Sequence, residues 1–345
     1  MPNTYIYFMK KLKAICLWFL RFGLSGVLIA FLCVAPFSLL PDILKAQGEV
    51  NKKEEYDYQG VLELWHIETF EGGSLSRAKF LESEAMLFEK KHKGAYVALQ
   101  TISLEQLELN LKAGKVPNMI SFGIGVGELF LDKLAVLDGA GAREDLLCGA
   151  KFNGQQLAVP YILGGYAMIY AGDGLTGVGL VGATNPLQAL QKNNIKVKKF
   201  YNDLNVDSYT AYDRFLRGNY KNLIGTQRDV YRCFNRSQKG LLTSNLTYKF
   251  LGGYTDLVQY LSVFRGSAIE QKICKEFAMQ VISSNAQSKL NNYNLFSVRK
   301  DVTLYSDGLY KDFEMELKRP LICENVFLPQ AQILQKKQHA YKAVC

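Results

Sequence analysis

The segment formed by residues 151–170 constrains the fold more than any other part of the sequence. It contains the pair Asn153-Gly154 between two short β-prone runs. Such a pair favours a two-residue hairpin, because both central residues of the turn take positive φ. The apolar residues 157–163 follow, the chain bends at Gly164-Gly165, and a second apolar run covers residues 166–170. The sequence therefore predicts a hairpin followed by two strands that join at a double glycine.

The rest of the chain alternates between strand-like and helix-like stretches. With 345 residues, 48% of them hydrophobic, it is long enough to bury a large core, and this length favours two domains. Alternating strands and helices favour a parallel sheet in an α/β domain. The elements expected first are a strand at 61–65, a helix around 80–88, a strand at 96–102, a helix at 105–115 and a strand at 119–122.

The first 47 residues are predicted to be a signal peptide or a signal anchor. Lys10, Lys11 and Lys13 precede a mostly apolar run, and residues 22–41 carry no charge. A basic segment before an apolar run is typical of export signals. The uncharged stretch is close to the ~20 residues that span a bilayer, so cleavage, lipidation and retention as an anchor all remain open. The polar residues 48–59 are predicted to be a linker.

Charge and motif content exclude several classes of protein. The net charge is +9, but no dense block of Lys or Arg occurs, which disfavours nucleic-acid binding. The histidines His66, His92 and His339 lack metal-ligand spacing, and we expect the last two to be solvated helix residues. Beyond the signal region no CxxC pair occurs, so we expect neither a zinc site nor a disulfide framework. We also expect no other metal and no cofactor. The cysteines expected to be buried instead are Cys148, Cys233, Cys274, Cys323 and Cys345.

A glycine string at residues 177–182 matches the G-x-G-x-x-G pattern of dinucleotide-binding loops. That mechanism needs the first glycine directly after a strand and a helix that opens within the motif. Here residues 171–174 intervene, and the next helix is predicted at 186–191 with Thr184 or Asn185 as its cap. We interpret the string as a loop. No phosphate-binding G-x-x-x-x-G-K-[ST] string occurs, so the chain is not a P-loop ATPase.

Several motifs, taken in order, resemble the extracellular solute-binding proteins of ABC importers, family 1, the sugar-binding type. The hairpin and double glycine resemble the hinge crossing of that family. Residues 60–66 resemble its first strand, residues 88–92 the end of its first helix, and residues 218–227 the second-lobe strand whose tip touches the ligand. The resemblance implies an α/β, two-lobed type II periplasmic-binding-protein fold with hinge strands between the lobes.

The resemblance also implies how the chain divides between the lobes. The expected ranges are 60–165 and 253–305 for lobe 1, and 166–252 and 306–345 for lobe 2. After the return to lobe 1 we expect helices at 256–264 and 270–282, and then a strand at 295–298 near the next crossing. Residues 324–341 are expected to pack on lobe 2. A buried strand of lobe 2 is expected at 223–225.

The candidate ligand-binding residues lie at predicted strand ends or crossings. An aromatic ring can pack on the apolar C–H face of a sugar, whose hydroxyls need polar partners. The aromatic candidates are Trp65, Phe122, Tyr161, Tyr166 and Tyr254. The polar candidates are His66, Glu71, Thr226, Gln227, Arg228 and Asp256. Core packing is an equally good interpretation of each aromatic residue and of His66, and Arg228 could instead pair with Asp229 or Asp256. Glu71 could instead favour the positive end of a helix that Ser74 caps.

The function implied by the resemblance is capture of a small polar solute, a sugar or oligosaccharide, between two closing lobes, and its delivery to an ABC permease. The expected protein is a monomer at the extracellular face of the cytoplasmic membrane, anchored or secreted, and is not an enzyme. Two alternatives remain. One is an exported carbohydrate-active hydrolase that uses Glu68 or Glu71 with a partner carboxylate, and the other is a sensor that presents ligand to a membrane receptor.

Overall fold

The computed structural model describes residues 13, 18, 23, 58–67, 77–171, 178–180, 185–197, 200, 208–219, 221–242, 245–306 and 308–344. Contacts divide the chain into residues 1–57 and residues 58–345, and both main sheets belong to the second unit. The predicted signal segment, apart from three residues, and most of the linker lie outside the described residues, as do Glu68, Glu71 and Ser74. No helix among the described residues is long and apolar enough to cross a membrane.

The first sheet has the strand order β2-β1-β3-β12-β6. Its strands are β1 (Gly60–His66), β2 (Ala95–Thr101), β3 (Met119–Phe122), β6 (Val159–Leu163) and β12 (Val258–Val263). β1 pairs with β2 and β3 in parallel, whereas β12 is antiparallel to both β3 and β6. The carboxyl ends of β1 and β3 therefore meet at one edge of the sheet, where open α/β sheets bind ligands.

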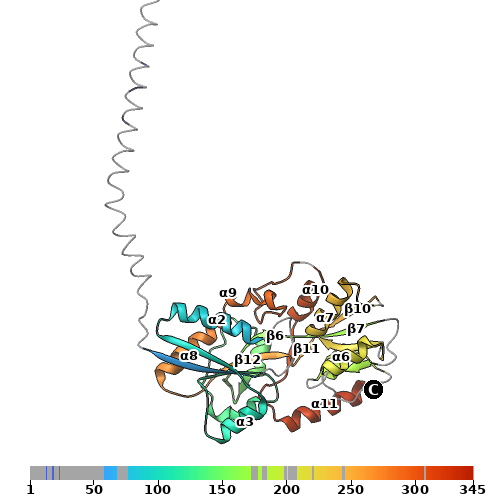
Figure 1. The fold of residues 1–345 in the computed structure, drawn as a ribbon, viewed down its shortest axis with the longest axis horizontal. Coiled ribbons are helices and arrows are strands. Elements are labelled where there is room, and N and C mark those ends of the chain that lie inside the picture. The colour runs from blue at the N-terminus through green and yellow to red at the C-terminus, as the bar shows by residue number, and fades with distance from the viewer. Residues whose placement is uncertain are drawn as a thin grey trace, which may run out of the picture. The chain divides into compact units, whose positions relative to one another are not determined.

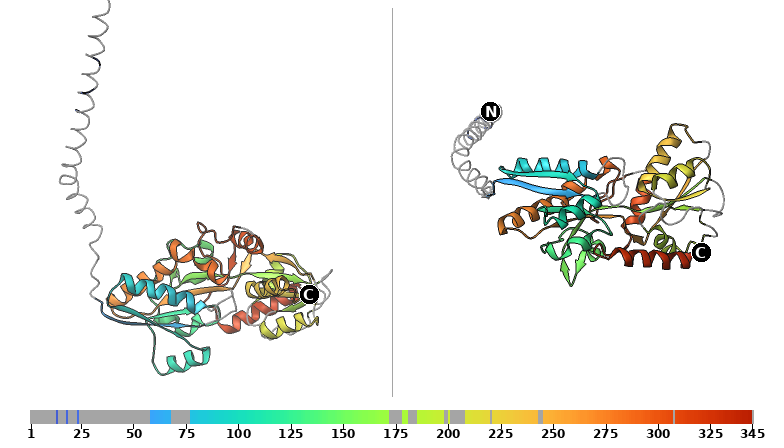
Figure 2. Two further views of the ribbon diagram at one scale, coloured as in Figure 1. Left: turned by 45° about the horizontal axis from the view of Figure 1, so that its top comes forward. Right: turned by 60° about the horizontal axis from the view of Figure 1, so that its bottom comes forward.

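Helices and short turns surround the first sheet. α2 (Arg77–Lys91) and α8 (Ala268–Val281) pack against each other and against β2 and β12, respectively (Figures 1 and 2). The remaining elements of this region are α3 (Leu104–Lys112), η1 (Gly127–Lys133), α4 (Glu144–Leu147), η2 (Cys148–Ala150), α9 (Ser284–Gln287) and η3 (Leu290–Tyr293). Ser103 caps α3 and Ser267 caps α8, where Ser267 forms a capping box with Glu270.

The second sheet has the order β10-β7-β9-β8. Its strands are β7 (Tyr166–Tyr170), β8 (Val178–Leu180), β9 (Asn222–Thr226) and β10 (Thr247–Leu251). β7 is antiparallel to β9 and β10, while β8 and β9 are parallel. The associated helices are α5 (Pro186–Lys192), α6 (Ser208–Leu216), α7 (Gln227–Gln238), α10 (Gly308–Lys318) and α11 (Gln330–Val344). α11 packs on α5 through Ala340 and Val344.

The predicted hairpin and double-glycine crossing are both present. β4 (Lys151–Phe152) and β5 (Gln155–Gln156) flank Asn153 and Gly154, whose φ values are 48° and 78°. Gly164 and Gly165 then join β6 to β7 with no room for a side chain. A Cβ on Gly164 would lie 2.8 Å from Leu257 Cβ, and one on Gly165 would lie 2.6 Å from Leu317 Cδ2. The glycines are thus required by close approach of neighbouring segments.

Two further segments run beside this crossing. β11 (Tyr254–Thr255) pairs in parallel with β13 (Ile322–Cys323). The Thr255 hydroxyl donates a hydrogen bond to the carbonyl of Gly164 (2.8 Å), and the Gly164 amide donates to the carbonyl of Leu257 (2.6 Å). The chain therefore passes between the two sheets in segments that are hydrogen-bonded to one another.

The structure corrects three predictions of secondary structure. Residues 256–264 were expected to be helical, but β12 forms there as a strand buried along its whole length, so no alternation of polar and apolar residues marked it. Residues 295–298 form only an isolated bridge, between Phe296 and Leu163, rather than a strand. Part of the glycine string at 177–182 is not a loop, because residues 178–180 form β8 beside β9.

Two expectations about side-chain exposure are also corrected. His92 is buried, with an exposed fraction of 4%, and its ring stacks on Phe88 at 4.1 Å, although it was expected to be solvated. Cys233 and Cys274 are buried as predicted, but Cys148 is exposed and Cys323 is half-buried. Cys345 lies outside the described residues. His339 is exposed on α11, as predicted.

Candidate functional site

A buried polar network joins the strand ends of the first sheet. Ser121 Oγ on β3 lies 2.8 Å from Nδ1 of His66 on β1 and 2.7 Å from the hydroxyl of Tyr161 on β6. The side-chain amide of Gln259 on β12 donates to Ser121 Oγ (3.0 Å) and to the carbonyl of Ile67 (2.8 Å). All four side chains are inaccessible to solvent. The network holds four neighbouring strands in register, because a buried hydrogen-bonding group is costly when it loses its partner.

The aromatic candidates of the first sheet are core residues in this structure. Trp65 has an exposed fraction of 4% and belongs to the main hydrophobic cluster, and Phe122 is fully buried. The ring of Phe122 meets Phe130 edge-on at 4.9 Å and lies 6.2 Å from Phe327. Both side chains therefore lie in the main hydrophobic cluster and are buried from solvent.

A second buried cluster lies where the chain passes between the sheets. The hydroxyl of Tyr166 donates to Asp256 Oδ1 (2.6 Å), and the backbone amide of Asn185 donates to Asp256 Oδ2 (2.7 Å). Tyr254 is fully buried next to them. Burial raises the pKa of the Asp256 carboxyl, the hydrogen bond from Tyr166 opposes this rise, and the negative charge of Glu324 adds to it. Asp256 thus links β7 to the residue that precedes α5.

The segment predicted as a ligand-binding loop is the start of a helix. Thr226 is the N-cap of α7 and forms a capping box with Asp229. Gln227, the first residue of the helix, is fully buried, and its Oε1 accepts a hydrogen bond from the amide of Gly165 (3.0 Å). Gln227 therefore ties α7 to the double-glycine crossing. Arg228 is partly exposed and is the most accessible of the predicted residues that the structure describes.

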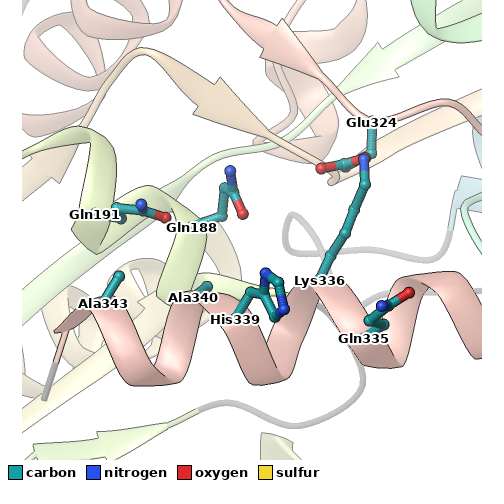
Figure 3. Close-up of a pocket in the computed structure, with 8 residues that line it drawn as sticks. All are labelled: Gln188, Gln191, Glu324, Gln335, Lys336, His339, Ala340 and Ala343. Atoms are coloured by element: carbon teal, nitrogen blue, oxygen red, sulfur yellow. The ribbon is translucent and has the colours of Figure 1, made fainter.

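A pocket of about 460 Å³ lies between α5 and α11 (Figure 3). It is lined by Gln188, Gln191, Glu324, Gln335, Lys336, His339, Ala340 and Ala343. Lys336 extends from α11 to Glu324, and Nζ lies 2.5 Å from Glu324 Oε2. The side chain of Gln188 points from α5 toward the same pair. Amides, a carboxylate, an ammonium and an imidazole thus converge on one hollow.

The sequence of α11 explains why these side chains face the same way. Gln335, His339 and Ala343 are four residues apart, as are Lys336 and Ala340, so they share one side of the helix. Two alanines leave space beneath the longer polar side chains. His339 was predicted to be a solvated helix residue, and the repeated polar-alanine spacing around it was the signal that would have indicated a pocket.

The pocket adjoins the crossing segments. Glu324 directly follows β13, and its charge contributes to raising the pKa of Tyr254, whose main cause is burial. Upstream of the pocket, Phe327 packs toward Phe122 of the first sheet, and a Cβ on Gly125 would lie 3.1 Å from Gln330 Oε1. α11 therefore begins near the loop after β3 and ends against α5.

None of the predicted site residues that the structure describes lines this pocket, and they do not form one cluster. His66 and Tyr161 share the network of the first sheet, Tyr166, Tyr254 and Asp256 share the crossing cluster, and Glu71 lies outside the described residues. Within the described ranges, no three His, Cys, Asp or Glu side chains gather into a metal-binding group.

The two sheets and the segments between them define the type II periplasmic-binding-protein fold, as predicted. Solved structures of this fold match at low sequence identity. The GacH receptor of Streptomyces glaucescens, solved with acarbose, has a TM-score of 0.60 and 14% identity, covering 84% of this chain and 94% of that one. The cyclic α-maltosyl-1,6-maltose-binding protein of Arthrobacter globiformis has a TM-score of 0.58 and 10% identity, covering 83% and 94%.

The structural neighbours are mainly binding proteins, but they include an enzyme. Thiaminase I of Bacillus thiaminolyticus matches with a TM-score of 0.56 and 13% identity, covering 83% of this chain and 100% of that one. No protein-family model matches the sequence, and no curated protein is similar enough to match it. The likeness is therefore one of fold.

Proposed function

We propose that this protein is the extracellular solute-binding component of an ABC importer and that it captures a sugar or oligosaccharide. The observation that carries the proposal is the polar pocket between α5 and α11, on a fold whose neighbours include proteins described as binding maltodextrin, acarbose and chitin oligosaccharide. Its volume of about 460 Å³ lies within the range of small-molecule sites, ~300–1,000 Å³.

The chemistry of the pocket favours a neutral, polyhydroxylated solute. Each sugar hydroxyl both donates and accepts hydrogen bonds, and the amides of Gln188, Gln191 and Gln335 can do both as well. Glu324 and Lys336 neutralise each other, so the pocket offers charge-assisted hydrogen bonds without favouring an ion.

Capture is proposed to involve closure of two lobes around the solute. The lobes are taken as residues 60–165 with 253–305, and residues 166–252 with 306–345. Support comes from the hydrogen-bonded segments between the sheets and from the tight glycine crossing at Gly164 and Gly165. A solute drives closure only by binding the closed arrangement better than the open one.

Among the predicted residues, Arg228 is proposed to contact a part of the solute that extends beyond the α5–α11 pocket, which Arg228 does not line, because it is partly exposed at the start of α7 and its guanidinium donates hydrogen bonds. Glu71 is proposed to accept hydrogen bonds from solute hydroxyls. The buried candidates are proposed to hold the sheets and the crossing segments that position the site. They are Trp65, His66, Phe122, Tyr161, Tyr166, Thr226, Gln227, Tyr254 and Asp256.

We propose that the protein is a monomer. Its proposed partner is an ABC permease, which would receive the solute from it. The proposed location is the extracellular face of the cytoplasmic membrane. This rests on the basic residues Lys10, Lys11 and Lys13 before an apolar run, which is typical of a signal peptide or anchor.

We propose binding rather than catalysis. A glycosidase needs two carboxylates across the scissile bond, whereas the described lining of the pocket contains one, Glu324, which is already paired with Lys336. The thiaminase I neighbour shows that this fold also carries enzymes, so activity has to be measured.

A thermal-shift screen tests the proposal, with maltotriose, chitotriose, cellobiose and a panel of amino acids and oxyanions as probes. At a hundred times its dissociation constant a solute stabilises the native state by ~2.7 kcal/mol. We expect a saccharide to raise the melting temperature and to be recovered intact by chromatography. A rise with amino acids alone, or release of reducing ends, would contradict the proposal.

A further inference from the structure

A second hollow, of about 560 Å³, lies between α6 and α7 of the second sheet. Among the described residues, it shares no lining residue with the pocket between α5 and α11. Tyrosines and arginines dominate its lining, together with Asn235. We infer that it is a separate binding site for a sugar that carries an anionic group, a carboxylate or a phosphate. The inference goes beyond the proposed import function and does not depend on it.

The tyrosines supply the surfaces for a sugar ring. Tyr209, near the start of α6, has an exposed fraction of 64%, and Tyr212, one turn later, has an exposed fraction of 6%. The guanidinium carbon of Arg232 lies 5.3 Å from the centre of the Tyr212 ring, which is a cation–π distance. The exposed ring of Tyr209 therefore offers an apolar face, and the guanidinium of Arg232 over Tyr212 places positive charge near it. A pyranose with an acidic substituent matches this pairing.

The charges of the hollow favour an anion. Three arginines line it, Arg217, Arg232 and Arg236, against one acidic residue, Asp213. Asp213 is already paired with Arg217 at 2.8 Å, and Arg232 faces Asp229 at 3.7 Å. Arg236 is exposed and, in the described part of the chain, forms no ion pair.

Arg236 is therefore the guanidinium available to a ligand. Guanidinium groups donate two parallel N–H hydrogen bonds to the oxygens of a carboxylate or phosphate, and these charge-assisted bonds are stronger than those to the neutral hydroxyls of a sugar. Arg236 lies four residues after Arg232 on α7, so the two cations face the hollow from the same side of one helix. An anionic substituent would sit between them, with the sugar ring toward Tyr209.

The test is titration of the full-length protein, followed by NMR, with glucuronate, glucose 6-phosphate and glucose. We expect one or both anionic sugars to bind, glucose to bind at least fivefold more weakly, and the affinity to fall as salt is raised, because exposed charges are screened. Arg236→Gln and Tyr209→Ala should each weaken the anionic sugar at least fivefold.

Two controls make the result specific. Arg319→Gln removes another exposed arginine, whose partner is Glu316, and should leave binding unchanged. Glu324→Gln in the other pocket should also leave it unchanged, which separates this site from the proposed import site. Equal binding of glucose, no binding of either anionic sugar, or full binding by a folded Arg236→Gln variant would overturn the inference.

Discussion

The ammonium of Lys336 lies 2.5 Å from the carboxylate of Glu324, and the two residues belong to different secondary-structure elements. Glu324 follows the crossing strand β13, whereas Lys336 is on α11. Glu324 has a side-chain exposed fraction of 9%, but that of Lys336 is 48%, so water screens the pair and limits its contribution to folding stability to ~1 kcal/mol or less. The pair is better suited to hydrogen-bonding a solute than to stabilising the fold.

The first prediction concerns this pair. Glu324→Gln keeps the shape of the side chain and removes its charge, so the variant should lose a charge-assisted hydrogen bond to the solute, of ~1.5–3 kcal/mol. We expect its saccharide affinity to fall at least tenfold in calorimetric titration while the ligand-free melting temperature changes by only a few degrees. Glu316→Gln, which breaks the surface pair with Arg319, is the matched control and should bind normally. Unchanged affinity in Glu324→Gln would remove the pocket from the solute site.

The second prediction separates wall residues from contact residues. Trp65→Ala should lower the free energy of unfolding by ~3–5 kcal/mol in urea, because the indole is buried in the main cluster. Arg228→Ala should leave that free energy nearly unchanged and reduce the shift in melting temperature caused by the solute. The opposite pattern, a stable Trp65→Ala protein that no longer responds to solute, would show that Trp65 touches the solute directly.

The third prediction concerns His92 and pH. Burial, together with Lys91, lowers the pKa of His92 below its usual 6.5, and Glu276 only partly opposes this. The unfolded chain therefore binds a proton near pH 6.5 that the folded chain resists, so stability is present above pH 6.5 and is lost as pH falls below it. His92→Phe should lose less stability than the natural chain between pH 7.5 and pH 5, by ~1.4 kcal/mol for each unit by which the pKa is lowered. Exposed His339, changed to Gln, is the control, and an identical pH profile for His92→Phe would refute the assignment.

The fourth prediction concerns the crossing between the sheets. Gly164→Ala would place a Cβ 2.8 Å from Leu257 Cβ, closer than two such atoms approach, so neighbouring backbone has to move. We expect a loss of ~1–3 kcal/mol in the free energy of unfolding, as for other overpacked sites. Gly266→Ala, whose Cβ would meet only the flexible end of Glu270 at 3.2 Å, should cost much less. An equal loss in the free energy of unfolding for both variants would show that close contacts at Gly164 are not the cause of the destabilisation.

Local features of the fold were predictable from sequence. The turn at Asn153-Gly154 needs positive φ, and the bend at Gly164-Gly165 leaves no room for a Cβ. Few residue types tolerate either condition, so both features could be predicted from the residue types. The strand β12 was not predictable in this way. It lies between β3 and β6 and is buried throughout, and a short apolar run of that kind has no period that separates strand from helix.

The candidate site was harder to predict than the fold. Trp65 and His66 do end a strand at the expected edge, but their side chains point into the core and into the Ser121 network, which depends on partners far along the chain. The pocket between α5 and α11 depends on how two distant helices pack. The sequence does not show how far Gln188 lies from Lys336, so the packing of α5 against α11 could be seen only in the structure.

The place of β12 in the first sheet has a consequence for how the polypeptide is made. Ribosomes produce the strands in chain order, so β3 and β6 both emerge long before the strand that fills the space between them. Until residues 258–263 follow, each of those two strands has an unpaired edge of the kind that promotes aggregation. The nascent chain cannot complete this sheet early. Such a delay would keep the nascent chain unfolded and able to pass through an export channel, as the proposed extracellular location requires.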